Sequence, residues 1–196
     1  LIRYFVHRGG HTEMVDRLDP STFARVAAES PAAWPEGVTV WADVAEPTEE
    51  DAAVLRHVFG LHELPVEAAV QRETQPKVES YGRYLYIVLH GINFQATEHT
   101  FESHETDFFL APNFLVTIHD GQRRSIAHVA ELCGRAQHIL SEGPVALLHR
   151  IVDTMVDHYR PEVDELEQRL DAIEKQVIEN PGETLTGDIL AVKNDI

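Results

Sequence analysis

The chain has 196 residues, of which 43% are hydrophobic and 25% charged, enough to bury one ordinary globular core. Its 33 acidic residues outnumber 16 basic ones, and the net charge of −17 excludes a nucleic-acid partner, because phosphate binding needs a basic face. The single cysteine, Cys133, excludes a disulfide within the chain and indicates a buried structural thiol in a reducing compartment.

The first part of the sequence predicts short strands separated by turns and helices. Strands are predicted, from alternating or β-branched residues, over 1–6, 11–18 and 38–44. Asp19-Pro20-Ser21 predicts the start of a helix between the second and third strands. Thr48 precedes two acids, so a second helix should begin there and stop near Gly60. A short acidic helix over 64–70 should follow it.

The middle of the sequence predicts the rest of a sheet. Strands are expected over 84–94, 100–110 and 114–119, the last two joined as a hairpin. Helical segments should follow from about Ser125 to Ser141. No run reaches the roughly 20 apolar residues that cross a bilayer, and no signal peptide is recognisable at the start. The chain as given is therefore expected not to span a membrane.

A long helix is predicted from Pro144 to Glu179. Its apolar positions repeat about every 3.5 residues, a seam typical of a helix that packs lengthwise on another helix; they are Leu148, Val152, Met155, Tyr159, Val163, Leu166, Leu170, Ile173 and Val177. Such a helix would be roughly 54 Å long at 1.5 Å per residue, too long for the interior of a domain of this size. We therefore divide the chain into an α/β domain over 1–143 and a helical extension over 144–196, which ends in the start of a further helix.

One stretch, GLHELPVEAAVQRETQPKVESYGRYLYIVL over residues 60–89, carries several motifs in fixed order and spacing. A G-L-H-x-L-x-x-E step leads to Pro-Lys-Val-Glu and then to an aromatic strand. Related motifs stand elsewhere, as Trp41-Ala42-Asp43, Val116-Thr117-Ile118-His119, DTMVDHY over 153–159 and LEQRLDAIEKQV over 166–177. Together they resemble the N-terminal cytosolic domain of CorA-type magnesium/cobalt transporters, and the resemblance covers nearly the whole chain.

The resemblance implies a fold and a function. The fold is α/β, a mixed β-sheet sandwiched between helices and followed by a long helical extension that begins a stalk. The function is that of a cytosolic regulatory domain without the transmembrane helices, which senses cytosolic cation and gates the pore. In the family the protein is a homopentamer in the inner membrane of a prokaryote, with this part facing the cytoplasm. The transmembrane helices and their Gly-Met-Asn signature would lie beyond Ile196.

The resemblance also implies a regulatory Mg²⁺ site. Glu67 matches the glutamate of an acidic pair whose aspartate is replaced here by Ala68, and Asp153 matches an acid early in the long helix. Asp157 is a neighbour of Asp153. One or two carboxylates suit Mg²⁺, which prefers oxygen ligands and keeps most of its waters. In the alternative interpretation, Asp153 and Asp157 form a solvated helix face or pair with Arg150 and Arg160.

Other readings stay open from the sequence. Twelve histidines allow a relative that transports zinc, and the closely spaced pairs are His7 with His11 and His99 with His104. Co²⁺ or Zn²⁺ could then replace Mg²⁺. His62 matches the family's histidine at the start of a helix, and a structural hydrogen bond is expected of it rather than metal ligation. A soluble acidic module that binds a protein partner through its helices is the competing class. No nucleophile elbow, phosphate-binding loop or Cys-His arrangement is present, so no enzyme is expected.

Overall fold

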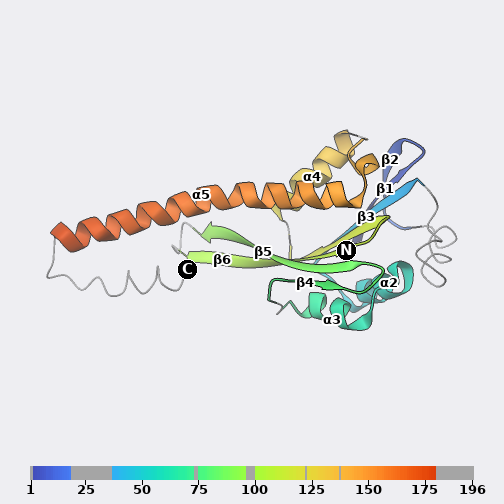
Figure 1. Ribbon diagram of the computed structural model, residues 1–196, viewed down its shortest axis with the longest axis horizontal. Helices are drawn as coiled ribbons and strands as arrows, with labels where there is room; N and C mark the ends of the chain where they lie inside the picture. The colour runs from blue at the N-terminus through green and yellow to red at the C-terminus, as the bar shows by residue number, and fades with distance from the viewer. Residues whose placement is uncertain are drawn as a thin grey trace. The chain divides into compact units, whose positions relative to one another are not determined.

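A computed structural model describes residues 2–18, 37–72, 75–95, 100–121, 123–136 and 138–179. Within them, seven strands form one sheet in the order β2-β1-β3-β7-β6-β5-β4 (Figure 1). The strands are β1 (Ile2–Arg8), β2 (His11–Val15), β3 (Val38–Ala45), β4 (Lys77–Ser80), β5 (Leu85–Gln95), β6 (Thr100–Leu110) and β7 (Phe114–His119). The predicted helix after Asp19 and the one expected to begin beyond Asn180-Pro181-Gly182 lie outside the described residues.

The centre of the sheet is a parallel pair. β3 runs parallel to β7, with Trp41 opposite Leu115 and Asp43 opposite Thr117. β1 pairs with β2 and β3, β6 with β7, and β4 with β5, all antiparallel, so the sheet is mixed as predicted. Because β3 and β7 are parallel, their carboxyl ends meet at one edge of the sheet, where polar side chains from neighbouring segments can gather.

Two helices cover one face of the sheet. α2 (Glu49–Phe59) begins at a capping box, in which the Thr48 hydroxyl and the Asp51 carboxylate each bind the other residue's backbone amide. It ends at Gly60, whose φ of 64° is left-handed and suits glycine. α3 (Glu63–Gln71) follows directly. Buried side chains of both helices, among them Leu55 and Val66, pack on the sheet in a hydrophobic core.

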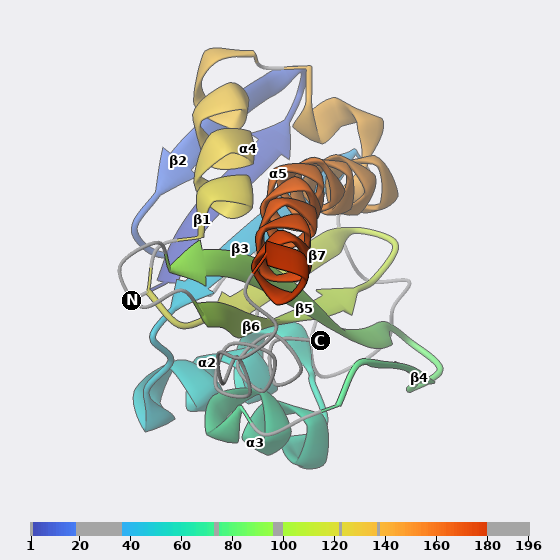
Figure 2. The ribbon, with the colours of Figure 1, turned by 90° about the vertical axis from the view of Figure 1, so that its left-hand side faces the viewer.

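The opposite face carries the helices that follow the sheet. They are α4 (Arg124–Arg135), the short 3-10 helix η2 (Leu140–Glu142) and α5 (Pro144–Glu179). α4 and the first part of α5 lie across the sheet from α2 and α3 (Figures 1 and 2). Leu147 and Ile151 are fully buried on this side, and so is Cys133, whose thiol pKa is raised to about 12 by burial. The prediction of a buried structural thiol is confirmed.

α5 has the bounds predicted from the sequence, and Pro161 lies inside it without ending it. The predicted seam is displaced at its start, since Leu147 and Ile151 are the fully buried positions and Leu148 and Val152 are half-buried. The displacement arises because the first turns pack on a face of the sheet. A sheet buries a different set of helix positions from the set that a partner helix would bury.

The chain separates into two compact units, residues 1–90 with 105–153 and residues 91–104 with 154–196. In the second unit, the Met155 Cε atom would lie 3.8 Å from a Cβ placed on Gly91, so α5 and β5 are in contact there. Large apolar side chains farther along α5, including Val163, Leu170 and Val177, are exposed. Among the described helices, none combines the length and apolarity needed to cross a bilayer.

Candidate functional site

α3 holds the first predicted ligand, and its two ends are well anchored. At its start, the His62 Nδ1 atom accepts a hydrogen bond from the Leu64 amide at 3.2 Å. The His62 amide donates to the Tyr84 hydroxyl at 2.9 Å. At its end, Arg72 adopts a left-handed conformation with φ of 55° and donates its amide to the Ala68 carbonyl. His62 therefore makes the predicted structural hydrogen bond, as the cap of the helix. At the other end, the Arg72 guanidinium donates to the His119 carbonyl at the end of β7.

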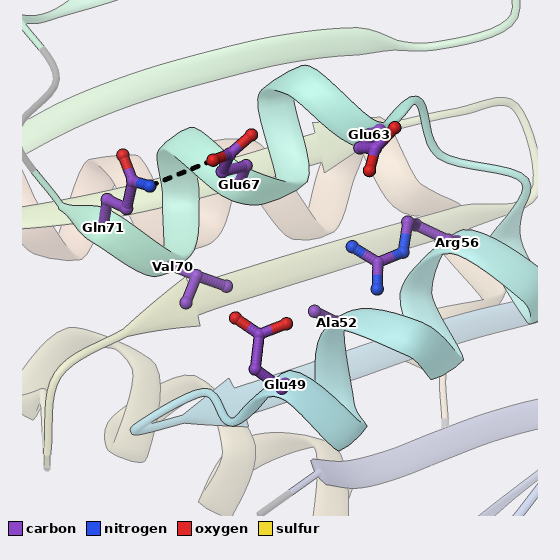
Figure 3. A pocket seen from close by; sticks show the side chains of 7 residues that line it. All are labelled: Glu49, Ala52, Arg56, Glu63, Glu67, Val70 and Gln71. Atoms are coloured by element: carbon purple, nitrogen blue, oxygen red, sulfur yellow. Dashed lines mark hydrogen bonds between the residues drawn. The ribbon is translucent and has the colours of Figure 1, made fainter.

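Glu67 lies on α3 beside a cavity of about 280 Å³ between α2 and α3 (Figure 3). The cavity is lined mainly by charged and polar side chains, namely Glu49, Ala52, Arg56, Glu63, Glu67, Val70 and Gln71. Gln71 Nε2 donates to Glu67 Oε1 at 3.1 Å, which holds one carboxylate oxygen in place. Three carboxylates against one guanidinium favour cations at this surface, and carboxylate oxygen is the ligand type that Mg²⁺ takes.

Asp153 and Asp157 lie on α5, and both are exposed. Arg150, a predicted partner for these acids, is bound to Glu142, with Nη2 2.7 Å from Oε2. α3 and the first part of α5 lie on opposite faces of the sheet (Figure 2), so one chain does not bring Glu67 and Asp153 together. Across the described part of the chain, no three histidine, cysteine or acidic side chains are grouped closely enough to hold a metal ion.

Two of the motifs that carry the resemblance meet in a buried polar network. Asp43 is fully buried and accepts hydrogen bonds from Thr117 Oγ1 at 2.7 Å and from Arg3 Nη2 at 2.5 Å. His119 Nε2 lies 2.9 Å from the same carboxylate, and Trp41 Nε1 donates to Thr117 Oγ1 at 3.1 Å. The motifs at 41–43 and 116–119 thus form one network across β3 and β7. The sequence contains both motifs, but only the strand register shows that they interact.

The electrostatics of this network favour an ionised Asp43. Burial alone would raise the pKa of its carboxyl group, but the hydrogen bonds and charges of His119, Thr117 and Arg3 outweigh burial and lower the pKa. The Arg3 side chain is 43% exposed, so it brings a positive charge to the carboxylate from the rim of the sheet. The network therefore stabilises the fold. Both carboxylate oxygens of Asp43 already accept hydrogen bonds from side chains, so Asp43 is a structural residue and not a candidate metal ligand.

The histidines do not assemble into a zinc-like set among the described residues. His7 Nδ1 is hydrogen-bonded to Thr12 Oγ1 at 2.9 Å, on the first hairpin. His119 belongs to the Asp43 network, and His99 lies outside the described residues. The observed roles are those of capping and packing groups.

Comparison with known sequences gives a consistent set of similarities. A family model described as "CorA-like Mg2+ transporter protein" matches residues 36–196. The chain is 32% identical over 162 residues to the Bacillus subtilis protein named "Putative metal ion transporter YfjQ", covering 83% of this chain and 50% of that protein. It is 26% identical over 124 residues to the cobalt/magnesium transport protein CorA of Thermotoga maritima, covering 63% of this chain and 35% of that protein. The chain thus spans about half or less of these relatives.

Solved structures show the same fold. The soluble domain of CorA from Methanocaldococcus jannaschii matches with a TM-score of 0.68 and 15% identity, covering 98% of this chain and 71% of that chain. The ZntB cytoplasmic domain from Vibrio parahaemolyticus matches with a TM-score of 0.61 and 11% identity, covering 87% and 64%. The predicted mixed sheet with a long helical extension is confirmed.

Proposed function

Because this chain belongs to the CorA-like Mg²⁺ transporter family, we propose that it is the cytosolic regulatory domain of a divalent-cation transporter, with Mg²⁺ as the favoured ion. The family match over residues 36–196 is the observation that carries the proposal. The names of the relatives, which are metal ion and cobalt/magnesium transporters, support it. An acidic surface on a chain of net charge −17 supports a cationic ligand.

The regulatory site is proposed to form between copies of the chain. Glu67 and Asp153 are both exposed and lie on opposite faces of one sheet. An ion that binds both must therefore join α3 of one copy to α5 of the next, with Asp157 close along the same helix. A hydrated Mg²⁺ ion suits such a site, since it needs only one or two carboxylates and keeps several waters.

Gating follows from the same charges. When ions occupy the sites, they neutralise facing carboxylates and hold neighbouring copies together. When the ions leave, the carboxylates repel each other and the copies separate. The exposed Val163, Leu170 and Val177 on α5 would supply apolar contacts to other helices of the assembly. A homopentamer attached to the inner membrane of a prokaryote, with this part in the cytoplasm, is the assembly that we propose.

Calorimetric titration with MgCl₂ tests the proposed ligands. We expect Glu67→Ala and Asp153→Ala each to lose most of the binding heat, because each removes one of the two anchoring carboxylates. Glu131→Ala is the matched control, since Glu131 is an exposed acid on α4 that pairs with Arg135. Parallel titrations with CoCl₂ and ZnCl₂ rank the ions.

Equal binding by the wild type and both variants would remove Glu67 and Asp153 as ligands. Tighter binding of Zn²⁺ than of Mg²⁺, undiminished by either variant, would contradict the proposed ion and direct attention to the histidines.

A further inference from the structure

A second buried acidic cluster lies on the other face of the sheet from Asp43. Asp107 on β6 is opposite Ile118 on β7, and Ile118 belongs to the core that α2 and α3 cover. Glu105 precedes Asp107 by two residues and so faces the same side of the strand. Asp107 is 1% exposed, and the Glu105 side chain is 9% exposed. Two carboxyl groups are thus removed from water side by side.

The Glu105 carboxyl group is close enough to Asp107 to act on it through both charge and hydrogen bonding. An ionised carboxylate has only acceptor atoms, so a hydrogen bond between two carboxyl groups needs a proton on one of them. The neighbours do not supply enough positive charge to ionise both. Tyr86 donates its hydroxyl to Asp107 Oδ1 at 2.6 Å, and His90 Nε2 lies 3.8 Å from Glu105 Oε2, where it is charged only if protonated.

Arg72 provides the fixed positive charge of the cluster. Its Nη2 donates to the His119 carbonyl at 3.3 Å, and its Nη1 lies 3.6 Å from Asp120 Oδ2. The guanidinium also interacts electrostatically with Asp107, Glu105 and Glu46, the last of which follows β3. Asp120 also pairs with Arg123, whereas Arg72 acts on the other three acids, and Arg72 is the residue that caps the end of α3.

We propose that Glu105 and Asp107 form a proton-binding site, which holds one proton between two carboxyl groups and passes its charge state to α3 through Arg72. With the proton bound, the pair carries one negative charge. On release it carries two, and the attraction on the Arg72 guanidinium increases. The site shares no residue with the cation site proposed above, so it stands or falls independently of it.

The titration range agrees with this geometry. Burial is the largest influence and raises the pKa of Asp107 to about 7; the Tyr86 hydrogen bond opposes it, Glu105 adds to it through charge and hydrogen bonding, and Arg72 opposes it. In the unfolded chain the same carboxyl group returns to its ordinary value of 3.8. Folding therefore takes up a proton between these two values, and the folded state loses stability as the pH rises from about 4 to about 7.

Two measurements on the intact chain test the site. Carbon-13 NMR of the side-chain carboxyl groups should show Asp107 releasing a proton with a midpoint near pH 7. Urea unfolding should be measured for the wild type and Asp107→Asn from about pH 4 to about pH 7. The ratio of the variant's folding equilibrium constant to that of the wild type should rise with pH, by up to about tenfold per pH unit. Asn keeps an acceptor for Tyr86 and adds a donor for Glu105, so its fold should be retained.

Two further variants complete the experiment. Asp16→Asn is the matched control, because it removes an exposed carboxylate beside β2, which is separated from β6 by three strands of the sheet, and it should keep the wild-type slope. Arg72→Gln removes the cation that favours the ionised pair, so its NMR midpoint should move to higher pH. If the Asp107 carboxyl group titrates as an ordinary acid, the proposal is overturned, whether or not Asp107→Asn folds. An unchanged midpoint in Arg72→Gln would overturn the link to α3.

Discussion

At the scale of single residues, Asp43 is a buried acid whose hydrogen bonds join β1, β3 and β7. Replacing it by asparagine keeps the shape but removes the negative charge that faces Arg3 and His119. We expect a loss of about 3 kcal/mol in the free energy of unfolding at neutral pH, the lower end for a broken buried pair, because Arg3 is partly exposed and regains water. Asp16→Asn, at an exposed position, should change it by less than about 0.5 kcal/mol.

The pH dependence of that loss has a definite direction. The pKa of Asp43 is lowered in the folded chain, so its contribution is present above the ordinary value of 3.8 and is lost as the pH falls through the lower folded value. The difference between the wild type and Asp43→Asn should therefore shrink in acid. A difference that stays constant down to low pH would mean that packing, and not the charge, is responsible.

The candidate ligands could be found from the sequence only through the family resemblance. Glu67, Asp153 and Asp157 are exposed, and nothing in hydrophobic periodicity separates them from the other acids of this chain. The Asp43 network and the Glu105–Asp107 pair were not predicted. The register of β3 and β7, which the sequence does not specify, brings Thr117 to Asp43. Glu105 and Asp107 are neighbours on β6, but their burial and the contact of Asp107 with Tyr86 depend on how the sheet and its helices pack.

At the scale of elements, the sequence predicted best where local signals are strong. The bounds of β6 and β7 agree with the prediction, because Ala111-Pro112-Asn113 marks the turn between them. The end of α2 at Gly60 follows from glycine's tolerance of a left-handed backbone. The displaced seam of α5 shows the limit, since the buried stripe depends on which partner the helix packs against.

The two parts of α5 should respond differently to truncation. Ile151 is fully buried, so Ile151→Ala should lower the free energy of unfolding by about 2–5 kcal/mol. Leu170 is 43% exposed, and Leu170→Ala should change it by less than about 0.5 kcal/mol. Urea unfolding of both variants makes the comparison. A large loss for Leu170→Ala would show that its face is already packed within a single chain, against the proposed role in assembly.

At the scale of the whole molecule, net charge opposes association. Copies with a charge of −17 repel each other, and monovalent salt screens that repulsion without bridging specific carboxylates. A divalent ion that binds Glu67 of one copy and Asp153 of the next should therefore promote assembly beyond the effect of ionic strength. A comparison of divalent and monovalent salts at equal ionic strength therefore separates ion bridging at the proposed site from general screening of charge.

The most direct test of the central claim is complementation between two variants. Sedimentation velocity would compare MgCl₂ with NaCl at matched ionic strength for Glu67→Ala, Asp153→Ala and their equimolar mixture. Each variant alone lacks one carboxylate at every contact, so neither should associate with Mg²⁺. In the mixture, some contacts pair an intact Glu67 with an intact Asp153, so we predict partial recovery of Mg²⁺-dependent association. A mixture that behaves like the separate variants, beside a wild type that does associate, would contradict a site shared between copies.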